Sequence, residues 1–422
     1  MLDLKRIRDD PDGVRDALAR REPELRAAID QLLSADSQWR SATASAESLR
    51  ATQRVSSEMI AAGKKSGADV SSELAKLKQM SADVKALTEQ AASAKRRLDE
   101  LITRLPNLPD PSAADGPEDE QIKTVGEPPS FSFEPRDHLE LAGSMIDMEH
   151  AAKLSGARFA YLRGELVMVE LALIGWALSK LRAKGFEPVI PPVLVRERAL
   201  YGTGFLPDTE QQIYSVPEDE LFLLGTSEVA LASLHADEIL DVDRLPLRYA
   251  GFSPCFRREA GAAGKDTRGI FRVHQFEKVE MYSFVAPEDS AAEHERILAI
   301  EEEILGELGL PYRVLNIAIG ELGNSAAKKY DCEAWLPSQG RYRELTSCSN
   351  TTDYQARRLE IRMRTDKRTR TPHTLNGTAV AVGRTIVALL ENGQREDGSV
   401  ELPEVLVPYG APARLEAAAR PS

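Results

Sequence analysis

Charged and aromatic residues lie close together between Gly251 and Phe284, on two segments that alternate like β-strands around a glycine-rich turn. Apolar residues such as Val279 and Met281 alternate with them, so these segments should be partly buried and their charges need partners. Guanidinium groups bind phosphate oxygens in pairs, and an aromatic ring offers a face on which a base can stack. The pattern predicts a site for a polyphosphate and a nucleobase, with a solvated hairpin as the alternative. The residues that carry it are Arg257, Glu259, Arg272, His274, Phe276, Glu277 and Glu280.

The turn between the two segments, GAAGKDTRG, superficially resembles a phosphate-binding loop. It does not fit the P-loop pattern, because Glu259 stands where the first glycine is required and Asp266 follows Lys265. It also joins two expected strands, whereas a P-loop joins a strand to a helix. We therefore expect arginine side chains to bind the phosphates, which makes Walker and Rossmann folds poor candidates.

A hydroxyl and a carboxylate, Thr226 and Glu228, follow a short apolar strand in the segment Leu221–Ala230. Two such groups at the end of a strand can converge on one cation, for example an ammonium group. The alternative is that they cap the helix that follows, and the local sequence favours this alternative.

Two further segments carry polar groups that could serve a nucleotide site. In YRELTSCSN, the oxygen atoms of Glu344 and Ser347 could bind a magnesium ion that is held mainly by substrate phosphates. In LNGTAVAVGRTIVALLENGQ, Arg384 lies on an apolar helix, where its charge is costly unless a ligand or a carboxylate pairs with it.

The composition excludes several classes of protein. The three cysteines are far apart in the sequence and form no CxxC pair, and the six histidines show no metal-ligand spacing, so no disulfide framework and no structural zinc are expected. The N-terminus is charged where a signal peptide needs an apolar core, and the most apolar stretch, Leu166–Leu181, is interrupted by Glu170 and Lys180. We expect a cytoplasmic protein without a membrane segment.

Apolar and small residues recur every three or four positions from Leu25 to Ile60 and again from Leu77 to Leu105. This spacing predicts two long helices that pack along a coiled-coil seam. The segment Gly63–Gly67 separates them, and its glycines are expected to end the first helix and to allow an antiparallel reversal.

The helical hairpin is more basic than the rest of the chain. Residues 1–104 contain 19 Lys and Arg against 17 Asp and Glu, whereas the whole chain has a formal charge of −13. A basic rod could bind the phosphates of a folded nucleic acid, but it could equally be a solvated surface or a protein-binding coiled coil. The cations that would contact nucleic acid include Arg40, Arg50, Arg54, Lys64, Lys65, Lys76, Lys78 and Lys85.

Seven prolines between Pro106 and Pro135 end the second helix and indicate a linker to about residue 136. A second domain is expected to follow, since 422 residues are too many for one core. Its first strong helix spans Gly164–Lys184. The prolines of the next segment, GFEPVIPPVLV, exclude helix and favour an extended edge or interface.

In their order, these segments resemble the signature motifs of class II aminoacyl-tRNA synthetases. GFEPVIPPVLV resembles motif 1, FRREA with VHQFEKVE resembles motif 2, and NGTAVAVGRT resembles motif 3. Together with GTSE, RELTSCSN and the N-terminal hairpin, these motif sequences are similar to those of bacterial-type seryl-tRNA synthetases. The resemblance covers nearly the whole chain.

The resemblance implies an α+β protein with a long antiparallel helical arm and a class II catalytic domain, whose mainly antiparallel sheet is flanked by helices. It implies a tRNA-binding hairpin domain at 1–105, a proline-rich linker at 106–136 and a catalytic domain at 137–422. The family works as a homodimer with tRNA bound across the two subunits, and the segment around Pro192 is implied to lie in the dimer interface.

The implied reaction has two steps: L-serine and ATP give seryl-adenylate and pyrophosphate, and the seryl group then moves to tRNA(Ser), or to tRNA(Sec) where present. ATP and Mg²⁺ are the implied substrate and metal ion. The arm would bind the long variable arm of the tRNA.

The family's roles fall on residues that match its motifs. Arg257 and Arg384 are the implied catalytic residues, with Phe276 and Arg384 enclosing adenine. ATP would be bound by Arg257, Arg258, Glu259, Val273, Phe276, Glu344, Leu345, Thr346, Ser347 and Arg384, and Mg²⁺ by Glu344 and Ser347. Serine would be bound by Thr226, Ser227, Glu228, Glu280, Asn376 and Thr378.

Two rival functions remain to be weighed. A synthetase-like enzyme could load an amino acid onto another acceptor, but the basic hairpin argues against it. A coiled-coil interaction protein with a degenerate catalytic body is the other rival, and the complete set of Arg257, Glu280, Glu344 and Arg384 argues against that.

Overall fold

The structure, a computed structural model, describes residues 1–207, 212–260, 266, 268–366 and 368–417. It contains two compact units, Met1–Pro106 and Asn107–Ser422. Part of the predicted phosphate turn, residues 261–265 and 267, lies outside the described residues. Among the described helices, none is both long and apolar enough to cross a membrane.

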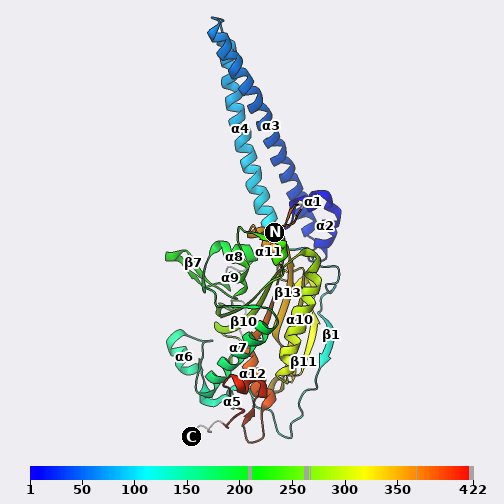
Figure 1. The fold of residues 1–422 in the computed structure, drawn as a ribbon, viewed down its shortest axis with the longest axis vertical. Helices are drawn as coiled ribbons and strands as arrows, with labels where there is room; N and C mark the ends of the chain where they lie inside the picture. Colours follow the sequence, from blue (N-terminus) through cyan, green and yellow to red (C-terminus); the bar gives the residue numbers. More distant parts are fainter. Residues whose placement is uncertain (208–211, 261–265, 267, 367, 418–422) are drawn as a thin grey trace. The chain divides into compact units, whose positions relative to one another are not determined.

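The N-terminal unit is built around two long helices, α3 (Leu25–Lys65) and α4 (Ser71–Arg104), which run side by side in opposite directions (Figure 1). Buried residues such as Leu32, Ala35 and Leu98 form the seam that the periodicity predicted. Two short helices, α1 (Leu4–Asp9) and α2 (Pro11–Ala19), precede the pair. The helical hairpin predicted from the sequence is thus confirmed.

The reversal differs in detail from the prediction. Helix α3 continues through Gly63 and ends at Lys65, so the first glycine does not terminate it. The backbone N–H of Ala68 donates to the carbonyl oxygen of Gly63 at 3.0 Å, and Gly67 has a φ of +77°, a left-handed conformation that glycine adopts without strain. Gly67 therefore makes the turn.

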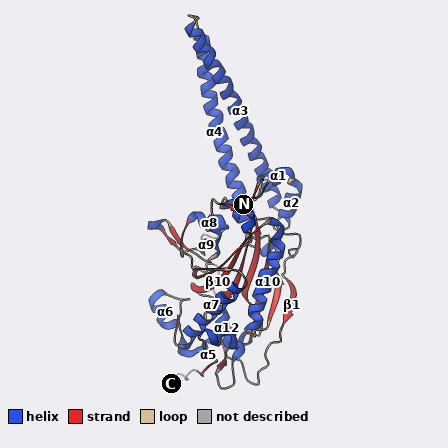
Figure 2. Cartoon of the chain, in the orientation of Figure 1, coloured by secondary structure: helices blue, strands red, loops and turns tan. Residues whose placement is uncertain are grey.

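The second unit contains an eight-stranded sheet in the order β1-β11-β12-β13-β16-β10-β9-β4. All neighbours are antiparallel except β4 and β9. Figure 2 shows these strands in red beside the helices that pack on them. Their bounds are β1 (Glu120–Val125), β4 (Glu187–Val189), β9 (Leu247–Phe256), β10 (Gln275–Val285), β11 (Tyr312–Asn316), β12 (Lys328–Leu336), β13 (Arg341–Thr352) and β16 (His373–Ala381).

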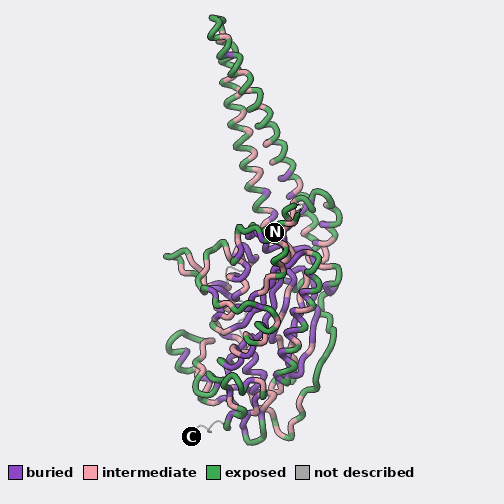
Figure 3. Tube along the Cα trace, viewed as in Figure 1, coloured by how far each residue is buried: buried purple, intermediate pink, exposed green. Residues whose placement is uncertain are grey.

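Three helices bury the apolar side of the sheet: α7 (Glu165–Ala183), α10 (Ser290–Glu307) and α12 (Val382–Gly393). Their apolar residues share one core with Val279 and Met281 of β10. Because side chains alternate along a strand, Lys278 and Glu280 point to the opposite face. Figure 3 shows buried residues, in purple, concentrated in the second unit.

Shorter elements surround this framework. Two of the small sheets have the orders β15-β14-β8 and β5-β7-β6. The helices are α5 (His138–Ala142), α6 (Met148–Ser155), α8 (Glu197–Thr203), α9 (Glu228–Ser233) and α11 (Tyr354–Arg358), and the strands are β2 (Ile146–Asp147), β3 (Tyr161–Leu162), β5 (Leu194–Arg196), β6 (Ser215–Val216), β7 (Leu221–Leu223), β8 (Ile239–Asp241), β14 (Arg362–Arg364), β15 (Thr369–Arg370), β17 (Val400–Glu401) and β18 (Arg414–Leu415).

Two proline-containing segments have definite places in the sheet. The segment 106–136, for which the sequence predicts a linker, contributes β1, an exposed strand that pairs with β11 at one edge. The segment GFEPVIPPVLV contributes β4 at the other edge, where Pro188 can lie without breaking the sheet. The hairpin between Gly251 and Phe284 forms β9 and β10, with β9 beside the edge strand β4, Phe276 opposite Cys255 and Glu280 opposite Gly251.

Candidate active site

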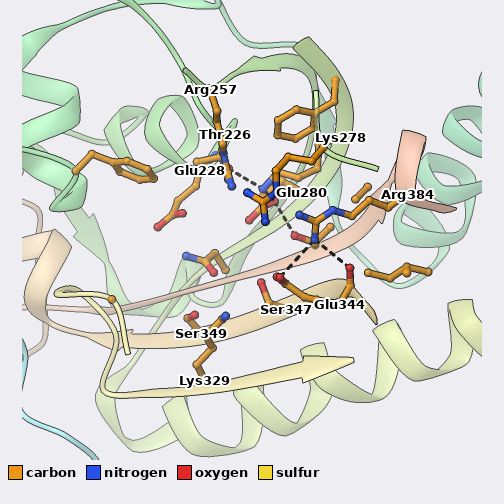
Figure 4. A pocket seen from close by; sticks show the side chains of 18 of the residues that line it. Thr226, Glu228, Arg257, Lys278, Glu280, Lys329, Glu344, Ser347, Ser349 and Arg384 are labelled. Carbon is orange, nitrogen blue, oxygen red and sulfur yellow. Dashed lines mark hydrogen bonds and ion pairs between the residues drawn. The ribbon is translucent and has the colours of Figure 1, made fainter. Parts of the chain in front are cut away.

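A cavity of about 480 Å³ lies over the polar face of the sheet. Its walls come from β10, β12, β13 and β16, from the start of α12, and from the segment that leads into α9 (Figure 4). Antiparallel pairing brings these strands together although they are up to about a hundred residues apart in the sequence. The cavity is therefore a product of the sheet order.

Arg257 follows β9 and lies against the aromatic residue of the paired strand. Its guanidinium carbon is 5.4 Å from the centroid of the Phe276 ring, and its Nε donates to the carbonyl oxygen of Gly225 at 3.1 Å. The ring and the carbonyl fix the plane of the guanidinium, while other N–H groups remain in the cavity wall. A positioned guanidinium of this kind can bind a phosphate or a carboxylate.

Arg384 enters the cavity from the first turn of α12. Its guanidinium carbon lies 4.9 Å from the centroid of the Phe271 ring, and its Nη1 donates to the carbonyl oxygen of Glu344 at 3.0 Å. It also forms an ion pair with the Glu344 carboxylate at 3.4 Å. Burial opposes ionisation of Glu344, but the cations Arg384, Lys329 and Arg257 lower its pKa below the usual value.

Three acidic or hydroxyl side chains form a second part of the cavity. Thr226 and Glu280 are buried, with 1% and 2% of their surface exposed, and Glu228 accepts a hydrogen bond from Gln355 Nε2 at 2.7 Å. Burial raises the pKa of Glu228, and burial raises the pKa of Glu280 to about 7. Lys278 pairs with Glu280 and donates to Thr226 Oγ1 at 2.8 Å.

Asn376 and Thr378 complete this acidic pocket from β16. Thr378 lies opposite Glu280 in the strand register, and its hydroxyl is 3.5 Å from a carboxylate oxygen of Glu280. On the other side of β16, Ser349 of β13 lies opposite Asn376. The pocket thus presents hydroxyl, amide and carboxylate groups, which together can bind a small zwitterion.

Most of the site residues predicted from the sequence come together in the cavity wall, and five do not. The hydroxyl of Ser227 packs 3.4 Å from the carbonyl oxygen of Gly251, and that of Thr346 donates to Glu301 at 2.9 Å on the core side. Arg258, His274 and Glu277 also lie outside the lining, whereas Arg272 is part of it. The lining contains Thr226, Glu228, Arg257, Glu259, Val273, Phe276, Glu280, Glu344, Leu345, Ser347, Asn376, Thr378 and Arg384.

Several residues for which the sequence motifs predict no role lie in or beside the cavity. Lys278 could have been found from strand periodicity, because it shares a face with Phe276 and Glu280. Gln355, which holds Glu228, lies on α11 and gives no local signal. Phe271 contacts two guanidinium groups. The guanidinium carbon of Arg343 lies 4.1 Å from the centroid of the Phe271 ring, and that of Arg384 lies 4.9 Å from it.

Metal binding in the described part of the chain would depend on few protein atoms. No group of three or more His, Cys, Asp or Glu side chains there is arranged to hold a metal ion. Glu344 and Ser347 line the cavity together, and Glu344 is kept ionised by nearby cations. Two oxygen ligands of this kind suit an ion whose other ligands come from phosphates and water.

The mainly antiparallel sheet, with an arginine and a phenylalanine on the hairpin of β9 and β10 and a second arginine on α12, defines a class II aminoacyl-tRNA synthetase core. The family profile described as "tRNA synthetase class II core domain (G, H, P, S and T)" matches residues 213–393. The profile described as "Seryl-tRNA synthetase N-terminal domain" matches residues 1–109.

Comparison with whole proteins narrows this class to one family. The chain is 52% identical to the serine–tRNA ligase of Streptomyces coelicolor, over 97% of both chains, and 50% identical to that of Nocardia farcinica, over 97% of this chain and 98% of the relative. It superposes on the ATP-complexed seryl-tRNA synthetase of Pyrococcus horikoshii with a TM-score of 0.95 and 42% identity, covering 99% and 100% of the two chains. The chain belongs to the seryl-tRNA synthetase family.

Proposed function

We propose that this protein activates L-serine with ATP and transfers the seryl group to tRNA(Ser). The observation that carries the proposal is that one cavity holds an acidic pocket for an ammonium group and two arginines, Arg257 for phosphate and Arg384 for a base. The guanidinium of Arg257, held by Gly225 and Phe276, lines this cavity.

The first step joins the serine carboxylate to the α-phosphorus of ATP. A carboxylate oxygen attacks phosphorus, the bond to the bridging oxygen of the β-phosphate breaks, and pyrophosphate leaves with that electron pair. No protein nucleophile takes part, so positioning and neutralisation of charge supply the catalysis. Arg257 would bind the α-phosphate, because its N–H groups are fixed at the end of β9.

We assign the adenine to the space between Phe276 and Arg384. An aromatic ring and a planar guanidinium can each stack on a base, which the ammonium of lysine cannot do. The backbone at Val273 and the carboxylate of Glu259 would contact the edge of the adenine. Glu259 is oriented for a contact of this kind by its ion pair with Arg272 at 2.5 Å. The similar seryl-tRNA synthetase of Pyrococcus horikoshii was solved with ATP, which supports ATP as the nucleotide of this site.

We assign Mg²⁺ to Glu344 and Ser347. A divalent ion bound there would neutralise phosphate charge, with the other ligands supplied by ATP and water. Leu345 lines the cavity between them and Thr346 turns its hydroxyl to Glu301, so any contact of Thr346 with ATP would use its backbone.

We assign serine to the acidic pocket. Thr226, Glu228 and Glu280 would bind its ammonium group and hydroxyl, with Asn376 and Thr378 closing the pocket, and Ser227 would act through its backbone. Alanine would leave the buried polar groups of the pocket without a partner, which makes its rejection strong. Threonine would be rejected by lack of space alone, and a steric criterion discriminates more weakly.

We propose that the helical hairpin binds tRNA and that tRNA(Sec) is a second substrate where the organism has one. In this assignment, residues 1–105 form the tRNA-binding domain, 106–136 connect it, and 137–422 carry the chemistry. Arg40 and Arg50 make contacts within the hairpin, to Asp36 at 2.9 Å and to Thr88 at 2.9 Å. The cations towards the turn are therefore better placed for phosphate: Arg54, Lys64, Lys65, Lys76, Lys78 and Lys85, of which Lys85 lies 4.0 Å from Glu89 on the same helix.

We propose a homodimer that acts in the cytoplasm and binds tRNA across its two subunits. Large apolar side chains are exposed on α7 and on the segment beside Pro192, with Leu171 55% and Ile190 80% exposed. Exposed apolar residues on neighbouring segments are typical of an interface. The others on these segments are Val167, Met168 and Leu194.

The test is serine-dependent exchange of pyrophosphate into ATP, followed by transfer of serine to purified tRNA(Ser). We expect both activities. Exchange without transfer would favour an enzyme that loads another acceptor, and absence of exchange would reject amino-acid activation altogether. Sedimentation of the purified protein would test the dimer, since a monomer at micromolar concentration would contradict it.

A further inference from the structure

The side chain of Lys278 lies inside the acidic pocket, between the groups assigned to serine. Only 8% of it is exposed. Its Nζ donates to Thr226 Oγ1 at 2.8 Å and forms an ion pair with the Glu280 carboxylate (Figure 4). One buried ammonium therefore joins a hydroxyl and a carboxylate that reach the pocket from different segments.

The charges around this lysine do not cancel. Glu228 and Glu280 bring two carboxylates to the pocket, and Lys278 brings one cation. When both carboxylates are ionised, they and one ammonium leave a single negative charge. The ammonium group of an amino acid would balance that charge, because it carries one positive charge. Arg257 is a further cation at the rim, and we have assigned it to the α-phosphate.

We infer that Lys278 is a positioning residue that keeps Glu280 ionised and holds the Thr226 hydroxyl in place, so that the pocket selects the ammonium form of serine. The inference rests on the proposed serine site. It adds a residue that contacts two of the side chains assigned to serine binding. Lys278 acts through Thr226 and Glu280, and it takes no part in breaking or forming bonds.

The physical reason is the cost of two buried carboxylates in one pocket. Burial raises the pKa of Glu280 to about 7 even though Lys278 opposes the shift. Without the lysine, the pKa of Glu280 would rise further, because Lys278 lowers it more than Arg257 does, and burial and the negative charge of Glu228 would remain. A protonated carboxyl cannot form an ion pair with an ammonium group, so serine would bind weakly at neutral pH.

The charged and titratable groups that face Glu280 come from several elements. Lys278 lies on the same strand, Glu228 begins α9, Arg257 follows β9, and Glu301 approaches from α10 on the other side of the sheet. The thiol of Cys255 on β9 is also near. Lys278 is the member of this set that touches both Thr226 and Glu280.

The experiment is the pH dependence of the serine KM in pyrophosphate exchange, measured from pH 6 to pH 9 for the wild type and Lys278→Met. Below the raised pKa of Glu280, the serine KM of the variant should increase about tenfold for each unit by which the pH falls. It should approach the wild-type value towards pH 9, while the KM for ATP changes by less than about twofold. A purely structural role of Lys278 would raise the serine KM equally at every pH, and that result would overturn the inference, as would an unchanged KM.

Two further variants sharpen the test. In Lys278→Met with Glu228→Gln, Glu280 is the one carboxylate left of the pair, so the part of the added pH dependence that Glu228 causes should disappear although serine binding stays weak. If the double variant keeps the full steep dependence, the charge of Glu228 is not what Lys278 offsets, and that result would overturn the inference. Lys278→Arg keeps the charge and should keep a profile close to the wild type, which also covers the case that the methionine variant fails to fold.

Lys180→Met is the matched control, because Lys180 also pairs with carboxylates, Glu303 and Glu307, but lies on α7 outside the cavity lining. Its serine KM should match the wild type at each pH. Serine-dependent exchange by the wild type distinguishes a failure of the proposed function from a failure of the role of Lys278. Its absence would reject the proposed function, whereas a flat profile of Lys278→Met beside normal wild-type exchange would reject only the role of Lys278.

Discussion

Arg384 and Phe271 are in contact across the cavity wall, with the guanidinium carbon of Arg384 4.9 Å from the centroid of the Phe271 ring. The arginine comes from α12 and the phenylalanine from the segment before β10, so the contact connects two motifs that are more than a hundred residues apart. It also fixes the plane in which Arg384 can meet a base, since a hydrogen bond to the Glu344 carbonyl holds the other side of the guanidinium.

This geometry leads to a prediction for Arg384→Lys. The variant keeps the charge but loses the planar stacking surface, which is worth about 1–2 kcal/mol, so the KM for ATP should rise about tenfold. Pyrophosphate exchange at varied ATP concentration measures it. Arg395→Lys, a change at an exposed arginine, is the control and should have no effect. An unchanged KM for ATP in Arg384→Lys would show that charge alone matters at this position.

Arg257→Ala should slow the activation step much more strongly. The loss of one positioned donor to a transition state costs about 3 kcal/mol, so kcat for exchange should fall about 100-fold or more. The control is Arg244→Ala, at an exposed position outside the cavity. If exchange by Arg257→Ala proceeds at the wild-type rate, Arg257 does not bind the α-phosphate.

Removal of residues 40–100 should separate the two steps. The residues assigned to activation all lie in the unit Asn107–Ser422, so adenylate formation should persist, whereas transfer to tRNA should be lost. Exchange and aminoacylation assays on the same preparation measure the two activities. Loss of both would contradict this division of roles, provided that circular dichroism finds the shortened protein folded.

The cations of the helical hairpin should differ in whether they contribute to tRNA binding or to folding stability. Lys64→Ala should weaken tRNA binding and reduce the slope of log affinity against log salt by about 1, as expected when one phosphate contact is lost. Arg40→Ala should instead lower stability, because Arg40 pairs with Asp36, a carboxylate whose side chain is only 1% exposed. Binding at several salt concentrations and urea unfolding distinguish them, and a salt effect of Arg40→Ala without loss of stability would reverse the assignment.

His294 should make stability depend on pH. Burial lowers its pKa from 6.5 to about 4, so the folded state favours the neutral ring. This contribution is present in full above pH 6.5, and it is lost as the pH falls from 6.5 towards 4, by about 3 kcal/mol in total. Urea unfolding at pH 7.5 and pH 4.5 should therefore give a smaller difference for His294→Gln than for the wild type.

The control for this prediction is Arg395→Gln, a change at an exposed position. Its unfolding free energy should follow the wild-type dependence on pH. Glutamine at position 294 can still donate to the carbonyl oxygen of Cys348, which His294 Nε2 approaches at 3.2 Å. An unchanged pH dependence in His294→Gln would mean that the ring is not held neutral in the folded protein.

Much of the fold could be predicted because its periodicities are local. The spacing from Leu25 to Ile60 is a property of one helix, and the alternation around Phe276 is a property of one strand, so neither requires knowledge of distant residues. Strand β1 was not predicted, since Glu120–Val125 is exposed and has no apolar face, and it forms only because β11 offers an edge. The residue at which α3 ends was also beyond local reasoning.

For the site, the sequence by itself determined which groups could do chemistry: Arg257, Glu280, Glu344 and Arg384 stand in motifs whose order identifies the family. Only the tertiary structure decided which way each side chain points. Ser227 and Thr346 turn towards Gly251 and Glu301, while Lys278 turns into the pocket. The physical reason is that a side chain's direction depends on the strand pairing and on the partners that satisfy its polar atoms, and these partners come from remote parts of the chain.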